Sequence, residues 1–172
     1  MAGTTDASPS SRTDVSGQAA IRPPCGVDDE RIFTFGLLLE SYNRLTRLLD
    51  AELQRTDGIS LQTYEVLLRI AREPQGFITM TGLSEAVSLT TGGITRLADR
   101  LEADGLVERV SCPSDRRKVH LTLTSRGNDV LATATEHHLQ SLQEHVTSRV
   151  APADLVVLHR VLDDLRSEPA SE

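Results

Sequence analysis

The chain has no tryptophan, and its 172 residues include only three phenylalanines and two tyrosines. Aliphatic side chains must therefore supply most of any core, which suits leucine-rich helices. Its two cysteines, Cys25 and Cys112, are too few and too far apart for the disulfide framework of a small secreted protein. The sequence also lacks an apolar run of roughly 18 to 20 residues, the length of a membrane span, and residues 1–26 lack the apolar core of a secretory signal. We therefore expect a cytoplasmic protein with no membrane partner.

Positive charge is scarce as well, since the formal net charge is -7. An anionic chain is poorly suited to coat nucleic acid nonspecifically, so any DNA contact must come from a local patch. One such segment exists, with five cations against the single anion Asp115 and a formal charge of +4. Its cations are Arg109, Arg116, Arg117, Lys118 and Arg126.

The first part of the sequence predicts a tail followed by two helices. Residues 1–27 are rich in Ser, Thr, Gly, Ala and Pro, which predicts a disordered tail. Residues 28–58 carry apolar side chains at helical spacing behind three acidic residues, and Gly58 is a plausible helix end. Ser60 is a good N-cap for the next helix, which Pro74 ends. The predicted buried stripe of this second helix consists of Tyr64, Leu67, Leu68 and Ala71.

A helix pair and a hairpin follow. Thr79 is the predicted N-cap of a short helix, MTGLSEAVS, and Thr90 that of the next helix, which Gly105 closes. The second helix is expected to bury Ile94, Leu97, Ala98 and Leu101. Strand patterns at 106–110 and 119–123 flank a basic turn. A helix-turn-helix joined to a cationic hairpin predicts a winged helix-turn-helix lobe that binds DNA, over residues 59–126.

Residues 127–168 contain two further helical patterns, separated at Pro152. Together with residues 28–58 they are more apolar than a small DNA-binding lobe needs to close its core, so we expect them to pair with a second copy of the chain. A homodimer also places two recognition helices one DNA turn apart, as a palindromic operator requires. The predicted fold class is therefore α+β, mostly helical, a winged helix-turn-helix with N- and C-terminal dimerisation helices.

The segment from Leu83 to Gly127 resembles the MarR family of winged-helix transcriptional regulators. The resemblance lies in the helix pair and above all in SDRRKVHLTLTSRG, with its Asp-Arg-Arg and Leu-Thr-x-x-Gly ending. It implies a triangular homodimer that usually represses transcription and whose DNA affinity changes with a phenolic or carboxylate ligand, an oxidant or a metal ion. It also implies a ligand pocket between the dimer helices and the DNA-binding lobe. Tyr42, Arg44, Arg47, Tyr64 and Arg69 lie near that pocket in such a fold, but we assign none of them.

The predicted DNA contacts fall in two groups. Helix-start backbone groups and hydroxyls meet phosphate, whereas side chains one turn further meet base edges. We expect Arg96 to read a base edge, with guanine as its partner. The helix residues are Thr90, Thr91, Gly92, Gly93, Thr95, Arg96 and Arg100. The wing residues are Asp115, Arg116, Arg117 and Lys118, among which Asp115 and Arg117 match the family's acid and minor-groove arginine.

Each of these readings has a structural alternative. Arg96 and Arg100 could pair with Asp99, Glu102 or Asp104 on a solvated helix face. Gly92 and Gly93 depart from the family's polar side chains there, which means a close approach to DNA, poorer base reading at these positions, or tight packing on the preceding helix. The wing charge could merely keep a hairpin tip soluble.

Other functions have weaker support in the sequence. His137, His138 and His145 could share a helix face, but without a recognisable ligand set we interpret His138 and His145 as half-buried dimer-helix residues and expect no metal or other cofactor. Cys25 and Cys112 have no activating neighbour that would make them redox sensors. We recognise neither a nucleophile paired with a base nor a phosphate-binding loop in the sequence, so nothing in it indicates an enzyme. The rival hypothesis is a winged-helix protein-interaction module without DNA binding.

Overall fold

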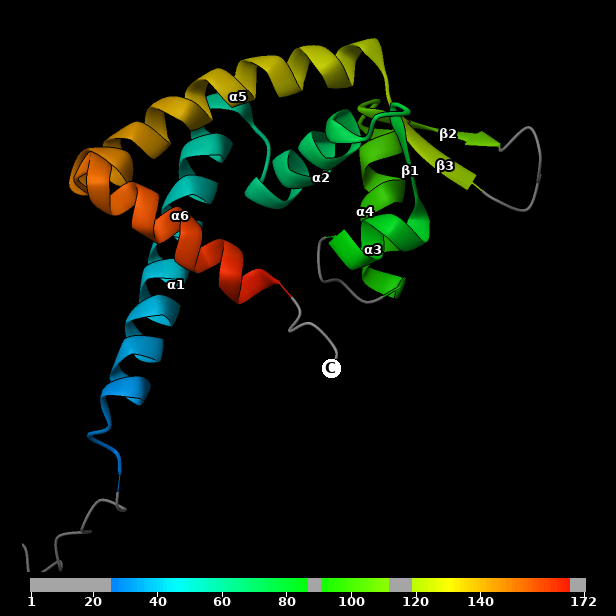
Figure 1. The fold of residues 1–172 in the computed structure, drawn as a ribbon. Coiled ribbons are helices and arrows are strands. Elements are labelled where there is room, and N and C mark those ends of the chain that lie inside the picture. The colour runs from blue at the N-terminus through cyan, green and yellow to red at the C-terminus, as the bar shows by residue number, and fades with distance from the viewer. Residues whose placement is uncertain (1–25, 87–90, 112–118, 168–172) are drawn as a thin grey trace, which may run out of the picture. The chain divides into compact units, whose positions relative to one another are not determined.

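A computed structural model of the chain describes residues 26–86, 91–111 and 119–167 (Figure 1). The predicted tail, apart from residues 26 and 27, lies outside these ranges. The chain divides into two compact units, Met1–Glu40 and Ser41–Glu172. Helix α1 (Glu30–Asp57) starts in the first unit and ends in the second. In the first unit Asp29 accepts a hydrogen bond from the Arg31 backbone N-H at 2.9 Å, and the apolar side chains that follow are exposed: Ile32, Phe33, Phe35, Leu37, Leu38 and Leu39.

The core of the second unit is aliphatic, as the composition predicts. It is built by the end of α1, by helices α2 (Leu61–Arg72), α3 (Met80–Ala86), α4 (Thr91–Ala103) and α5 (Ser125–His145), and by side chains of the small sheet described below. Tyr64 is the single aromatic side chain among the buried residues of the described ranges. The most deeply buried large side chains are each at most 1% exposed: Leu53, Val66, Leu67, Ile70, Leu83, Ile94, Leu101 and Leu121.

Local capping explains where the helices begin and end. The Ser60 hydroxyl accepts a hydrogen bond from the Thr63 N-H at 3.1 Å, and the Asp50 carboxylate accepts one from the Leu61 N-H at 2.8 Å. Gly58 and Gly105 both have a φ of +69°, the left-handed backbone that glycine adopts without strain. The predicted cap at Ser60 and the predicted helix ends at both glycines are confirmed.

The predicted buried stripe of α2 is partly wrong. Tyr64 and Leu67 are buried and Leu68 is half-buried, but Ala71 is exposed. The buried face is instead centred on Val66 and Ile70, which have no exposed surface. The apolar side chains of this 12-residue helix cover much of its circumference, so two overlapping stripes could face the core. Val66 and Ile70 are larger than Ala71 and bury more apolar surface, so their side of the helix faces the core.

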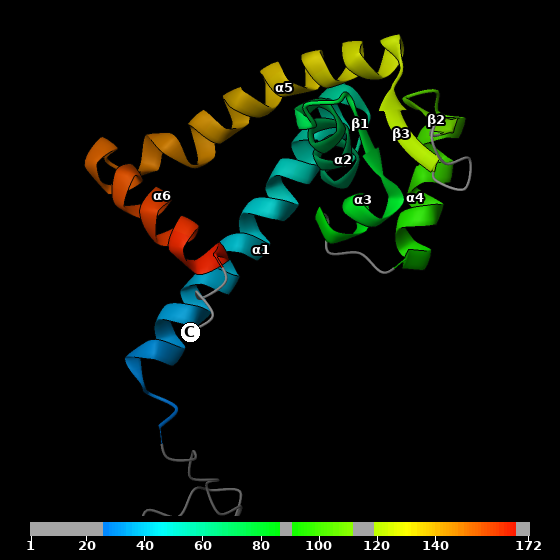
Figure 2. The same ribbon diagram turned by 45° about the vertical axis from the view of Figure 1, so that its right-hand side comes forward.

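A third strand completes the hairpin into a small antiparallel sheet. Strand β1 (Phe77–Thr79) pairs with β3 (Val119–Leu123), which pairs in turn with β2 (Val107–Ser111), so the order is β1-β3-β2. The Phe77 and His120 rings stack with centroids 4.2 Å apart, on the sheet face away from the buried Ile78 and Leu121. Both views place α3 and α4 beside this sheet (Figure 2). The sequence did not predict β1.

The C-terminal region contains α5, a 3₁₀ turn at Thr147–Arg149, and α6 (Pro152–Arg166). Pro152 occupies the first turn of α6, in agreement with the predicted break. Helix α6 buries none of its 15 residues, and its Val156 and Leu165 side chains are 71% and 67% exposed. Within the described ranges, no helix is both long and apolar enough to cross a membrane.

Candidate nucleic-acid interface

Helix α4 presents two arginines to solvent. Its predicted buried face is confirmed, because Ile94, Leu97, Ala98 and Leu101 are all at most 3% exposed. The opposite face therefore points outward, and Arg96 and Arg100 on it are exposed. Neither guanidinium makes an ion pair or hydrogen bond with another residue of the described ranges. Both are available to a ligand outside the chain.

Both carboxylates of α4 pair with an arginine from a neighbouring strand. Arg109 of β2 pairs with Asp99 at 2.6 Å and also with Glu102. The hydrogen bond that Arg109 donates to the Asp99 carboxylate raises the pKa of Arg109, while burial acts in the opposite direction. Both acids are held by Arg109, and neither pairs with Arg96 or Arg100 in the described ranges. The α4 arginines keep their charge exposed.

Strands β2 and β3 lead into the basic turn. They pair in register from Val107 opposite Leu123 to Ser111 opposite Val119. The four predicted wing residues, Asp115, Arg116, Arg117 and Lys118, lie outside the described residues, as do Cys25, Cys112 and Thr90. Of Thr91 and Gly92 the structure describes only the helical backbone. Of the other predicted helix residues, Gly93 is half-buried and Thr95 is exposed.

The base of the hairpin is joined to α5 by a compact backbone junction. The Thr124 hydroxyl accepts a hydrogen bond from the Gly127 N-H at 2.9 Å and donates one to the Gly105 carbonyl at 2.7 Å. The Thr124 N-H donates to the Leu106 carbonyl at 3.1 Å. A β-carbon added at Gly127 would lie 1.9 Å from that same Leu106 oxygen. Thr124 and Gly127 thus fix the start of α5 on the hairpin base, a role that the sequence pattern did not reveal.

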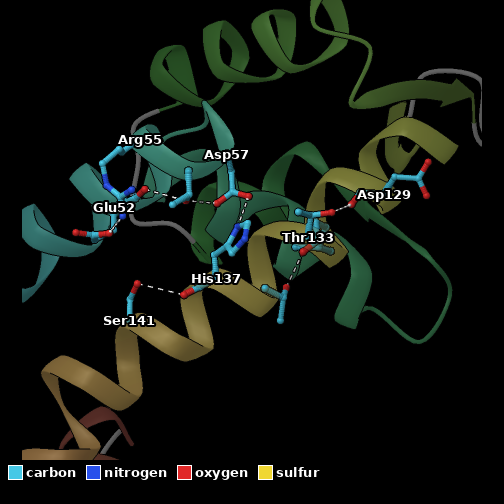
Figure 3. A network of polar contacts seen from close by, with 10 residues as sticks. Glu52, Arg55, Asp57, Asp129, Thr133, His137 and Ser141 are labelled. Atoms are coloured by element: carbon cyan, nitrogen blue, oxygen red, sulfur yellow. Dashed lines mark hydrogen bonds and ion pairs between the residues drawn. The ribbon is translucent and has the colours of Figure 1, made fainter.

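The three histidines singled out in the sequence have separate surroundings. His137 Nδ1 lies 2.8 Å from an Asp57 oxygen, which links α5 to the end of α1 (Figure 3). The Asp57 side chain is 4% exposed, and its other oxygen accepts from the Thr56 hydroxyl at 2.5 Å. His138 and His145 are half-buried, as predicted. Among the residues that the structure describes, no group of three His, Cys, Asp or Glu side chains could hold a metal ion.

His138 packs against the core rather than pairing with an acid. Its ring centroid lies 4.6 Å from that of Tyr64, and its Nδ1 atom is buried without a hydrogen-bond partner. Burial lowers the pKa of His138, because the charged ring would lose its hydration. His138 is therefore a packing residue whose burial favours the neutral ring.

Two open hollows lie on the surface of the second unit. One, of about 400 Å³, is lined by α2, β1 and α3 and includes Arg69 and Glu73, which pair at 3.3 Å. The other, of about 340 Å³, lies beside Asp57 and is lined also by Thr56, Asp129, Val130 and Thr133. Of the five unassigned candidates for a ligand pocket, only Arg69 lines either hollow.

The two aspartates beside the second hollow provide a stability test. Replacing buried Asp57 with alanine removes the acceptor of two hydrogen bonds, so the free energy of unfolding is expected to fall by about 1 to 3 kcal/mol. Asp129 is exposed and pairs with no cation in the described ranges, so Asp129→Ala is the matched control and is expected to change stability by at most about 0.5 kcal/mol. Urea unfolding of both variants measures the difference. Equal midpoints would show that the contact between Asp57 and His137 contributes nothing.

The sequence is similar to known transcriptional regulators. A family model described as MarR family matches residues 57–118. The chain is similar to the multiple antibiotic resistance protein MarR of Salmonella typhimurium, with 30% identity over 132 residues, which are 76% of this chain and 90% of that protein. It is also similar to the transcriptional repressor MprA of Escherichia coli, with 31% identity over 94 residues, 55% of this chain and 49% of MprA.

Solved structures resemble most of the chain. Sco3205, a MarR family transcriptional regulator from Streptomyces coelicolor in complex with DNA, has 27% identity and a TM-score of 0.76, covering 84% of this chain and 95% of its own. AbsC from the same organism has 28% identity and a TM-score of 0.73, with coverages of 81% and 93%. A mutant MarR from Escherichia coli complexed with operator DNA has 27% identity and a TM-score of 0.71, with coverages of 82% and 99%.

Proposed function

Because this chain belongs to the MarR family, we propose that it represses transcription by binding a palindromic operator as a homodimer. It is a winged helix-turn-helix transcriptional regulator, and its partner is double-stranded DNA. The observation that supports operator binding most directly is the exposed face of α4. There Arg96 and Arg100 have no intramolecular partner within the described ranges, while the neighbouring acids are held by Arg109. Unpaired guanidinium groups on a recognition helix suit base edges and phosphates.

The proposed DNA contacts lie in both grooves of the duplex. Arg96 reads a base edge in the major groove, and Arg100 neutralises phosphate. Arg117 enters the minor groove with Asp115 fixing its guanidinium, as the resemblance to the family implies. Further phosphate contacts are assigned to Thr90, Thr91, Gly92, Gly93, Thr95, Arg116 and Lys118.

The homodimer is supported by apolar surface that nothing in the described ranges covers. In the second unit α6 carries exposed Val156, Val157 and Leu165, and in the first unit Phe33 and Phe35 are exposed. Large exposed apolar patches on a protein mark sites of protein–protein interaction. We assign residues 28–58 and 127–168 to dimerisation and residues 59–126 to DNA binding.

Regulation by a small molecule is proposed from the resemblance to the family. A small-molecule effector changes the affinity of the dimer for its operator, at a site that we do not assign. The protein acts by binding and not by catalysis, requires no cofactor, and works in the cytoplasm.

Binding to DNA flanking its own gene tests this function. Footprinting should reveal a protected palindrome, and candidate effectors added to the same assay should change the protection. If the dimer neutralises about six phosphates, its affinity should fall on the order of a thousandfold between 50 and 200 mM salt. Absence of salt-dependent duplex binding would instead favour the protein-interaction module.

A further inference from the structure

Helix α4 has no net positive charge of its own. Its charged side chains are Arg96, Asp99, Arg100 and Glu102, two of each sign. Asp99 is three residues from Arg96 and adjacent to Arg100, and the side chains of Asp99 and Glu102 are 58% and 40% exposed. Without a partner, the carboxylate of Asp99 would lie beside Arg96 on the exposed face of the helix, and that of Glu102 would add a second negative charge at its flank. Like charges brought together at an interface reduce affinity.

Arg109 supplies the missing charge from a neighbouring strand. It lies opposite Leu121 in the pairing of β2 with β3, and Leu121 is fully buried. Directly opposed residues share a sheet face, so Arg109 points to the core side, towards α4. Its strand neighbours Glu108 and Val110 are exposed on the other face. The Arg109 side chain is accordingly only 28% exposed and ends on Asp99 and Glu102.

We propose that Arg109 is a positioning residue for DNA binding, which neutralises the two carboxylates of α4 so that Arg96 and Arg100 present a net positive face to the operator. This role rests on the proposed function, because it has meaning only if α4 meets DNA. The guanidinium suits the task, since it can hold two acids at once in a partly buried position. In this role Arg109 acts through α4 and does not touch a phosphate.

Arg109→Gln tests the role in the full-length protein. With both carboxylates released, operator affinity measured by fluorescence anisotropy should fall at least about tenfold, because two anions then face the DNA. Arg109→Lys keeps the charge but not the fork that holds both acids, so its affinity should lie between those of Arg109→Gln and wild type. Unchanged affinity in Arg109→Gln would overturn the role.

Rescue separates neutralisation from direct contact. Adding Asp99→Asn and Glu102→Gln to the Arg109→Gln chain removes the anions that Arg109 covers, so affinity should return to within about threefold of wild type. If Arg109 bound phosphate itself or only supported the fold, Asp99→Asn with Glu102→Gln would raise affinity by the same factor in the wild-type chain as in the Arg109→Gln chain, which would refute the proposal. Thermal unfolding and gel filtration confirm that each variant remains folded and dimeric.

Asp99→Asn tests the role without removing Arg109. Asp99→Asn in the wild-type chain keeps the pair between Arg109 and Glu102 and removes one negative charge, so operator affinity should rise about two- to fivefold. A lower affinity would contradict the proposal. Failure of the wild-type protein to bind any duplex would refute the proposed function, whereas failure of these variants with intact wild-type binding refutes the role of Arg109 alone.

Discussion

Gly127→Ala is expected to destabilise the protein by about 3 kcal/mol or more. In an ordinary helix the same substitution stabilises by up to about 1 kcal/mol, because alanine is the better helix former. At Gly127 the sign reverses, since the new β-carbon would lie 1.9 Å from the Leu106 carbonyl oxygen and 2.9 Å from its carbon. Both atoms belong to the backbone, so no side-chain rotation can relieve the overlap. Either the start of α5 or the base of the hairpin must move.

The expected result is a lower urea midpoint together with weaker operator binding, because the junction sets the position of the wing strands relative to α5. Arg126→Ala is the matched control: Arg126 occupies the same helical turn, is exposed, and should change stability by at most about 0.5 kcal/mol. A Gly127→Ala protein as stable as wild type would show that the two backbones do not meet as described.

Hydrophobic spacing and capping residues were sufficient to predict α4. Its apolar residues follow a single stripe, so Ile94 and Leu101 could face only the core, and Gly105 provided an unambiguous end. Helix α2 has two overlapping stripes, and periodicity alone favoured the wrong flank at Ala71. Strand β1 has three residues, too few for alternation to be visible. Its place in the sheet depends on pairing with β3, which is a tertiary contact.

Contacts between distant residues could not be predicted from spacing. Asp57 and His137 are 80 residues apart, and only the packing of α5 brings them together. The partner of Asp99 depends on which face of β2 meets α4, so spacing along the sequence offered only the nearby Arg96 and Arg100 as alternatives and not Arg109. The pattern Leu-Thr-x-x-Gly was visible in the sequence, but its reason was not. The junction explains it, because Thr124 caps α5 and Gly127 leaves room for Leu106.

Arg96→Ala is expected to weaken binding to the operator by about 10- to 100-fold, because a bidentate contact from arginine to guanine contributes on the order of 1 to 3 kcal/mol of discrimination. The exposed position of Arg96 on α4, without an intramolecular partner in the described ranges, predicts little effect on folding. Fluorescence anisotropy with the operator and with operators substituted one base pair at a time measures both affinity and specificity. The variant should lose discrimination at one base pair in each half-site and keep it elsewhere.

Arg96→Lys distinguishes base reading from charge alone. Lysine retains the positive charge but not the planar fork that matches a guanine edge, so it should restore affinity for nonspecific duplex without restoring discrimination. Arg96 and Arg100 are both exposed on the same helix, and Arg100→Ala should lower affinity for all sequences alike, because its proposed partner is a phosphate. If Arg96→Ala also weakened every duplex equally, Arg96 would be a second phosphate contact, and sequence would have to be read by other residues of α4 or by the shape of the minor groove.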